Sequence, residues 1–400
     1  MSILTLAPLA ALLAAVIWII YQRLDPAIGF DYAGHLDYVR YIDFTLSIPL
    51  ADRGWQTYHP PAYYALAAAI FEALHRLGWG GTITDAGRWV ATAAWVLEGV
   101  TAIATVRLIG AGWVASAVAA ALVWLLPGQS MMGTMLYNET LTGLGVGLMT
   151  LGLVFWWRRR TAGLALIGVG FALALLSKYS GAVAAATALP IILYVGRDRL
   201  RPTLLALAPG LILGAAYYGR NLLVFGTPTP LNSELFHLSA WDYFGWGHPA
   251  GFFTTLDLGR CAAQHSFWGG FWKWFWAADC YPPPLPWPTL IGLSLMVGAL
   301  FATIMIAVAL GWTATRALKD PVSLYLFAIP AALFIAFVAY NLRVPSPTTD
   351  KGVYVLAAIV PVAVATGLFA QRAARSWMTL VLYVVVLIWS VDMAHASGLG

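Results

Sequence analysis

Long apolar runs account for most of this sequence. Runs of about 16 to 23 residues lie at 4–21, 89–108, 112–127, 139–157, 161–177, 181–195, 202–219, 289–311, 322–341, 353–370 and 377–394. An α-helix needs about 20 apolar residues to cross the hydrocarbon core of a bilayer. Because hydrophobic residues make up 61% of the 400 residues, a soluble protein could not bury them all. The sequence therefore predicts an all-α polytopic membrane protein of about eleven transmembrane helices.

Basic residues cluster in short segments between these runs, at Arg158–Arg160, Arg197–Arg201, Arg316–Lys319 and Arg372–Arg375. Cytoplasmic loops of membrane proteins carry an excess of Lys and Arg, so we expect all of these clusters on the cytoplasmic side. The net charge of +5 thus reports topology and not nucleic-acid binding. Counting spans outward from the clusters places the N-terminus inside, the C-terminus outside, and the long polar inserts 23–88 and 220–288 on the outer face.

The first run and a shorter run need separate interpretation. Residues 4–21 lack the basic segment and the small-residue cleavage site of a signal peptide, so we expect a retained first span. The run from Ala62 to Leu74, at about 13 residues, is too short for a comfortable span. If it crossed, the preceding insert would lie inside, away from the other long loops. We therefore expect 62–77 to form a juxtamembrane or re-entrant helix on the outer face of a single membrane domain, 1–400.

Ionisable residues concentrate at the outer ends of the predicted spans. The first insert holds Asp31, His35, Asp37, Asp43, Asp52 and His59, although charged residues are only 10% of the chain. Asp31 and His35 are four residues apart, so one helical face can present both side chains. A second acid, Glu139, begins another span. The cations at outer span ends are Lys178, Arg220 and Lys351.

This combination suits a lipid-phosphate transferase. A carboxylate can take the proton of an acceptor, while Lys and Arg neutralise a departing phosphate. The alternative is that each charge only reaches to the membrane interface from a span end. Nucleotide-binding loops, zinc-ligand spacing and a GxSxG element do not occur in the sequence.

The order of short motifs resembles that of a known superfamily. The motifs are D-x-x-x-H at Asp31, YHPP ending at Pro61, N-E at Glu139, LSKYSG around Lys178, RNLxxFGxP after Arg220 and K-G-x-Y at Lys351–Tyr354. Together they resemble the GT-C membrane glycosyltransferases, and more narrowly bacterial family-39-like enzymes related to protein O-mannosyltransferases and lipid A aminoarabinose transferases. The likeness covers most of the chain. Two departures are that the first-insert acid pair of the family reads Asp31-Tyr32 here, and that His59 stands where the family often has Lys.

The resemblance implies a GT-C-like fold and a reaction. A sugar would move from a polyprenyl-phosphate carrier to an acceptor at the outer, periplasmic face of the bacterial inner membrane. Asp31 and Glu139 would be the catalytic carboxylates: Asp31 would deprotonate or orient the acceptor hydroxyl, and Glu139 would orient a sugar hydroxyl or an optional divalent cation. No cofactor is required, and no metal site is expected. The residues that would bind substrate are His35, His59, Lys178, Arg220, Lys351 and Tyr354.

Two alternatives from other classes remain open. The first is a non-catalytic GT-C-fold subunit with a structural or lipid-binding role in a larger membrane complex with partner subunits, which the single acid in the first insert favours. The second is a transporter, although the chain lacks the two related halves typical of transporters.

Several further residues carry weaker signals. Glu98 lies inside a predicted span and is either functional or a helix-packing residue. The irregular spacing of His237, His248 and His265 argues against a metal site. Cys261 and Cys280 share an outer insert, so we expect a disulfide that contributes roughly 3 kcal/mol. The aromatic block from His265 to Pro288 either anchors the chain at the membrane interface or forms a wall for a lipid chain or a sugar ring.

Overall fold

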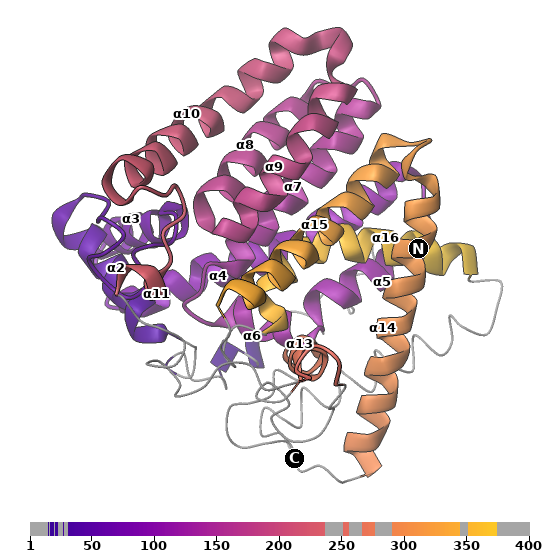
Figure 1. Cartoon of the computed structure of the whole chain (residues 1–400), viewed down its shortest axis with the longest axis horizontal. Coiled ribbons are helices and arrows are strands. Elements are labelled where there is room, and N and C mark those ends of the chain that lie inside the picture. Colours follow the sequence, from indigo (N-terminus) through magenta and orange to yellow (C-terminus); the bar gives the residue numbers. More distant parts are fainter. Residues whose placement is uncertain are drawn as a thin grey trace.

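The computed structural model (Figure 1) describes residues 31–236, 251–255, 266–276, 290–344 and 351–373, with a few positions between 15 and 27. Within these ranges the chain is helical and contains no strand, as predicted. The disulfide prediction for Cys261 and Cys280, and the three histidines His237, His248 and His265, lie outside the described residues.

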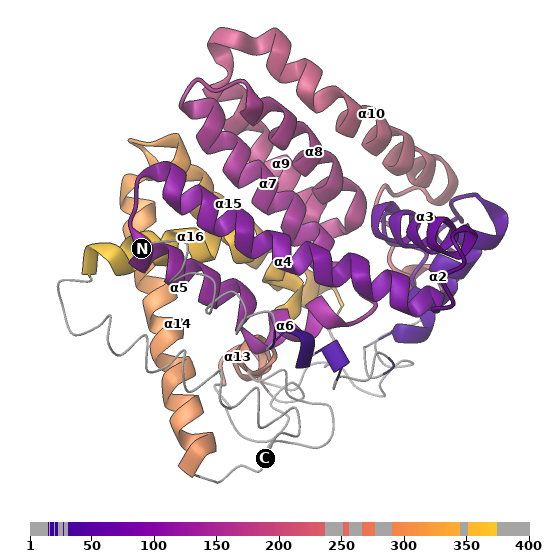
Figure 2. The ribbon, with the colours of Figure 1, turned by 180° about the vertical axis from the view of Figure 1, so that it is seen from behind.

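The first insert forms two helices that pack on the first described membrane helix. They are α2 (Tyr32–Thr45) and α3 (Ala62–Arg76), and they lie at the N-terminal end of α4 (Ile83–Ile109). Seen from behind, α4 runs from this pair towards the start of α5 (Figure 2). The start of α4 is fixed by a capping box, in which Thr82 and Asp85 each accept a backbone N–H of the other. Both the separate 62–77 helix and a helix after Asp31 agree with the sequence prediction.

The run 112–127 was predicted as one span, and the structure adds a bend near its end. The structure has two helices, α5 (Trp113–Trp124) and α6 (Pro127–Thr134), bent by 58° at the break between them. Pro127 is the first residue of α6. It has no backbone N–H to continue the hydrogen-bond ladder of α5, and its ring clashes with the preceding turn. The break turns the chain so that it leads into the segment before Glu139.

Four helices then follow in antiparallel order: α7 (Glu139–Trp157), α8 (Ala162–Ser177), α9 (Tyr179–Val195) and α10 (Leu200–Phe225). Glycines bring α7 and α8 into backbone contact. A Cβ on Gly145 would lie 2.5 Å from the Ala174 backbone N, and a Cβ on Gly163 would lie 2.5 Å from the Gly152 carbonyl oxygen. Small residues are the usual means of such close approach between membrane helices. This register sets the start of α7 beside the end of α8.

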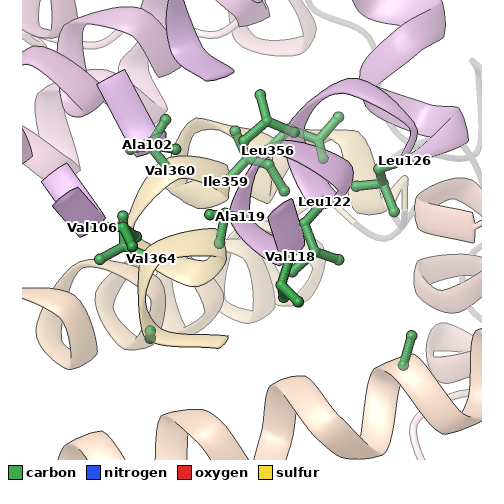
Figure 3. Packing of buried hydrophobic residues seen from close by; sticks show 14 of the residues in the cluster. Ala102, Val106, Val118, Ala119, Leu122, Leu126, Leu356, Ile359, Val360 and Val364 are labelled. Carbon is green, nitrogen blue, oxygen red and sulfur yellow. The ribbon is translucent and has the colours of Figure 1, made fainter. Parts of the chain in front are cut away.

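The C-terminal half supplies one of the most buried spans of the bundle. Its elements are α11 (Asn232–Leu235), α13 (Phe267–Trp276), α14 (Leu290–Ala317), α15 (Pro321–Arg343), η4 (Gly352–Ala358) and α16 (Ile359–Ala373). Figure 3 shows side chains of α4, α5 and α16 interlocking in one apolar cluster, including Val106, Val118 and Val360. In the span Gly352–Ala373, which contains η4 and α16, 83% of the apolar window is buried inside the protein. The corresponding share is 28% in the span Arg197–Phe225, which contains α10. Thus α16 is central and α10 lies at the periphery.

The turns between helices gather at two opposite ends. At one end Arg158 donates to the Ile109 carbonyl at 3.1 Å, and Arg159 pairs with Asp198 at 3.3 Å. The basic turns at Arg158–Arg160 and Arg197–Arg201 therefore share one end of the bundle, as expected if both clusters are cytoplasmic. The opposite end holds α2, α3, α11 and the start of η4 (Figure 1).

The number of spans stays a prediction. Among the described residues, six helices are long and apolar enough to cross a membrane, or seven if the bent pair is one span. Helices α8 and α9 are apolar but shorter. The predicted spans 377–394 and most of 4–21 lie outside the described residues.

Candidate functional site

The site is organised around a buried ion pair. Glu139 is the first residue of α7, and Lys178 is an extended residue, φ −158° and ψ 158°, that separates α8 from α9. The glycine-mediated register of α7 and α8 sets them side by side, and the Lys178 ammonium contacts the Glu139 carboxylate. The two residues are only 5% and 3% exposed. Removing both charges from water is costly, so each group depends on the other for compensation.

Aromatic rings and a second lysine surround the Lys178 ammonium. It lies 5.0 Å from the centre of the Tyr354 ring and 5.5 Å from that of Tyr137. Burial lowers the pKa of Lys178 to about 7, an effect that the Asp31 carboxylate opposes and Lys351 reinforces. The contacting Glu139 carboxylate also favours the charged ammonium. Asp31 and Lys351 thus have opposite effects on the charge of Lys178.

Two histidines line this region in their neutral form. The His35 and His59 rings are stacked 6.2 Å apart, and His35 Nδ1 is hydrogen-bonded to the Tyr64 hydroxyl at 2.8 Å. Burial lowers the pKa of His35 to about 3 and that of His59 well below its usual range, and the nearby Lys178 adds to both effects. His59 is thus an uncharged hydrogen-bonding group at neutral pH, where the resemblance would place a lysine.

Asp31 is the residue before α2 and has an uncommon backbone conformation. Its φ of 57° and ψ of 19° lie in the left-handed region, which Asp tolerates better than most residues. Its carboxylate accepts a hydrogen bond from the Trp55 indole N–H at 2.9 Å. The residue is exposed, unlike the Glu139 carboxylate.

Arg220 and Lys351 occupy different positions around the ion pair. Lys351 is 7% exposed and precedes η4, which carries Tyr354. Arg220 donates to the Ile48 carbonyl at 3.2 Å and so fastens the first insert to the end of α10. It is not among the residues that line the groove described next. Arg220 as a phosphate ligand therefore stays a prediction.

A groove of about 560 Å³ opens beside Lys178 between α9 and α15. We call it the α9–α15 groove. Its polar end is formed by Tyr58, His59, Lys178, Arg343 and Tyr354. Its apolar wall is formed by Ala182, Val183 and Ala186 of α9 and by Leu333, Ala336 and Phe337 of α15. At 1.5 Å rise per residue, this apolar wall covers roughly 6 Å along each of the two helices.

The sequence analysis did not choose Tyr58, Tyr179 or Arg343, which also line this groove. Arg343, at the end of α15, pairs with Glu234 of α11. The Tyr179 hydroxyl donates to the Tyr58 carbonyl at 2.7 Å, which ties α9 to the segment before His59. Arg343 carried the same signal as the cations that were chosen, since it also ends a span on the predicted outer face.

The residues fit a divalent cation poorly. Among the described residues no three His, Cys, Asp or Glu side chains gather as metal ligands. Glu139, the predicted partner of an optional cation, is in contact with Lys178 instead. We therefore assign no step to a cation.

The intramembrane acid Glu98 has a partner of its own. It is buried in α4 and accepts a hydrogen bond from the Gln129 side chain of α6. This contact joins α4 to the helix after the bend and supports the helix-packing interpretation.

Comparison with known proteins gives similarity at the level of the fold. No family model and no curated protein matches the sequence. The structure of ArnT from Cupriavidus metallidurans bound to undecaprenyl phosphate superposes with a TM-score of 0.54 at 15% identity, over 92% of this chain and 61% of that chain. The apo state of the same ArnT gives 0.56 at 16% identity, over 93% and 62%.

An archaeal structure gives a similar result. The oligosaccharyltransferase AglB from Archaeoglobus fulgidus, in complex with an inhibitory peptide and a dolichol-phosphate, gives a TM-score of 0.52 at 13% identity, over 98% of this chain and 56% of that chain. The present chain thus spans 56–62% of the length of these proteins.

Proposed function

We propose that this chain, whose fold is similar to those of ArnT and AglB, is a membrane glycosyltransferase of the GT-C type that moves a sugar from a polyprenyl-phosphate carrier to an acceptor. The observation that carries this proposal is the α9–α15 groove, which has a buried lysine at one end and an apolar wall along two helices. Such a shape suits an amphipathic lipid with an anionic head. The ArnT structure is bound to undecaprenyl phosphate, and the AglB structure includes a dolichol-phosphate.

The polar end of the groove suits the carrier phosphate. Lys178 supplies an ammonium, and Arg343 supplies a guanidinium at the mouth. The backbone N–H groups of the first turn of α9, which starts directly after Lys178, form the positive end of a helix dipole. Neutral His59 adds a hydrogen-bonding group without further charge. The apolar wall would receive the first isoprene units of the carrier.

The transfer step follows from this placement. The bond between the anomeric carbon and the phosphate oxygen breaks, and the acceptor oxygen forms a bond to that carbon. The proton of the acceptor passes to the Asp31 carboxylate, which is exposed and interacts electrostatically with Lys178. The leaving polyprenyl phosphate takes the bonding electron pair and so gains one negative charge, which Lys178 and Arg343, the cations that line the groove, stabilise. The Glu139 carboxylate holds the Lys178 ammonium in position through their ion pair.

We place this reaction at the periplasmic face of a bacterial inner membrane. The site shares an end of the bundle with the polar inserts, and the basic turns lie at the other end. The positive-inside rule supports this orientation.

A second candidate function is a non-catalytic lipid-binding subunit. The observation that favours it is the engagement of Glu139 by Lys178, which leaves Asp31 as the acid exposed to an acceptor. Such a protein would bind the carrier lipid without turning it over.

Lipid retention tests the groove. We expect the purified full chain to retain undecaprenyl phosphate in native mass spectrometry, and Ala336→Trp, which fills the apolar wall, to lose at least about tenfold in affinity, or about 1.4 kcal/mol. Ile335→Trp is the matched control, since this neighbour on α15 is 68% exposed and points away from the groove. Equal retention by both variants would contradict the proposal. A radiolabelled polyprenyl-phosphate sugar then separates the two candidates, because a subunit binds the lipid but releases no free polyprenyl phosphate.

A further inference from the structure

The asparagine that precedes Glu139 makes an unusual contact for its position. Asn138 is the N-cap residue of α7, where an Asn side chain commonly accepts a backbone N–H of its own helix. Among the described residues it accepts no such bond. Its Nδ2 amide instead donates to the Ser177 carbonyl at 2.9 Å, and both residues are fully buried. The side chain of Asn138 thus connects the start of α7 to the end of α8.

The Ser177 carbonyl requires a donor from outside its helix. The carbonyls of the last turn of a helix have no partner within that helix. Many helices satisfy them with a left-handed residue directly after the last turn. Here that position is Lys178, which is extended and is the one residue between α8 and α9. The Asn138 amide supplies a donor instead, so α8 can end abruptly while Lys178 stays extended.

The junction between α8 and α9 is held on both sides of Lys178. Before it lies the bond from Asn138 to Ser177, and the next residue of each segment forms the buried ion pair. After it, a Cβ on Gly181 of α9 would lie 2.8 Å from Thr142 Cγ2 of α7. Two consecutive residues of α7 thus contact two consecutive residues of the junction, and α9 closes on the next turn of the same helix.

From this arrangement we infer that Asn138 is a positioning residue of the site: its amide fixes the backbone at Ser177 and so holds the Lys178 ammonium against Glu139. The inference rests on the proposed function, in which Lys178 binds the carrier phosphate. Asn138 does not line the α9–α15 groove, so it acts through Lys178.

This role has a consequence for the charge of the lysine. Asn138→Leu leaves the Ser177 carbonyl buried without its donor, which is costly, so the junction shifts towards another donor. The ammonium then lies further from the Glu139 carboxylate, which favours its charged form. The other ionisable groups that interact with Lys178 lie on other segments and keep their places: Asp31, His35, His59 and Lys351. We therefore expect the pKa of Lys178 to fall by about one unit.

The titration of Lys178 can be measured without any ligand. The sequence has four lysines, Lys178, Lys273, Lys319 and Lys351, so a chain labelled with ¹³C at lysine Cε gives four NMR signals. The signal that disappears in Lys178→Met belongs to Lys178, and its shift follows protonation of the amine. We expect the midpoint in Asn138→Leu to lie about one pH unit below that of the parent chain.

Two controls match the location and the substitution. Thr142→Val removes a hydroxyl that donates to the Asn138 carbonyl at 2.9 Å, but it keeps the Asn138 amide. Asn341→Leu makes the same change at another fully buried asparagine, whose amide donates to the Phe337 carbonyl of its own helix at 3.0 Å. We expect both controls to keep the parent midpoint.

Lipid affinity should follow the charge of the lysine. If the midpoint falls from about 7 to about 6, the charged fraction of Lys178 at pH 7 falls from about one half to about one tenth, and the affinity for undecaprenyl phosphate falls about fivefold. At about pH 5.5 the lysine is mostly charged in both chains, so the difference should nearly vanish. A loss of the same size at every pH would mark a general structural defect and overturn the inference.

The outcomes separate this inference from the proposed function. An unchanged Lys178 midpoint in folded Asn138→Leu, or an equal shift in either control, overturns the positioning role. If Asn138→Leu does not fold, Asn138→Ala replaces it, with the same expectation. A shifted midpoint together with no retention of undecaprenyl phosphate by the parent chain overturns the proposed function, while Asn138 still positions Lys178.

Discussion

The Glu139–Lys178 pair allows a quantitative test of how the site is built. Glu139→Gln keeps the size of the side chain but removes the charge that compensates the buried ammonium. Two unit charges about 4 Å apart interact by roughly 4 kcal/mol at an effective dielectric constant of about 20. Breaking a buried pair by removing one partner typically costs about 3–5 kcal/mol. Since the two residues are only 3% and 5% exposed, we expect Glu139→Gln to fall within this range.

The reciprocal change should cost less. Glu139 lies in the first turn of α7, where the positive end of the helix dipole stabilises a carboxylate left alone. Lys178 directly precedes the first turn of α9, where the same field disfavours an ammonium left alone. We expect Lys178→Met to be less destabilising than Glu139→Gln by about 1 kcal/mol. The double variant buries no charge, and we expect it to recover most of the loss.

The measurement is a double-mutant cycle on the free energy of unfolding, from SDS titration of the purified chain in mixed micelles followed by circular dichroism. We expect a coupling energy of at least about 2 kcal/mol between the two positions. Costs that simply add, with a coupling below about 0.5 kcal/mol, would refute the view that the two charges compensate each other in the folded protein.

Three further predictions concern chemistry and topology. Asp31→Asn should lower transfer by about 100- to 10,000-fold with lipid retention unchanged, since the amide cannot accept a proton; a variant that keeps its turnover would remove Asp31 as the base. Because burial lowers the pKa of Lys178 to about 7, the lysine loses its charge as pH rises. Affinity for undecaprenyl phosphate, whose phosphate is doubly ionised above about pH 6, should fall between pH 7 and 9 in the parent chain and stay flat in Lys178→Met. Gly80→Cys tests the topology, because a Cβ at this position meets open space. In a background with Cys261 and Cys280 replaced by serine, we expect labelling only from the periplasmic side. Labelling only from the cytoplasm would reverse the predicted position of 62–77.

The sequence predicted the helical elements well because their signal is local. The length and apolarity of a run determine whether it can form a membrane helix, and the helix over 62–77 was found in this way. The helix after Asp31 was predicted from the helical spacing of Asp31 and His35. The bend between α5 and α6 was missed although Pro127 is visible in the sequence. A proline near the end of an apolar run can either end a span or kink it, and only the packing of α6 against α4 through Gln129 and Glu98 selects the break.

The candidate site was predicted in part. Placing charges at span ends identified Asp31, Glu139, Lys178 and Lys351 as residues of one face; in the structure Glu139 contacts Lys178, and Asp31 and Lys351 both act on the charge of Lys178. The same argument gave no reason to pair Glu139 with Lys178, or to separate Arg220 from the groove. The order of spans limits a residue to the rim of the bundle, but it does not say which parts of the rim meet.

By itself the sequence predicted a bundle of apolar helices, with the basic clusters at one end and the candidate acids and cations of the site at the other. These properties follow from hydrophobic length and charge distribution, which each segment carries on its own. The tertiary structure alone decided the register of α7 and α8, set by glycines at 145, 152, 163 and 170, and hence the ion pair at their ends. It also decided that α9 and α15 leave a groove and that Trp55 meets Phe236 beside Asp31. Each of these contacts joins segments far apart in the chain, so its energy depends on which helices are neighbours, and an apolar run can pack against many partners equally well.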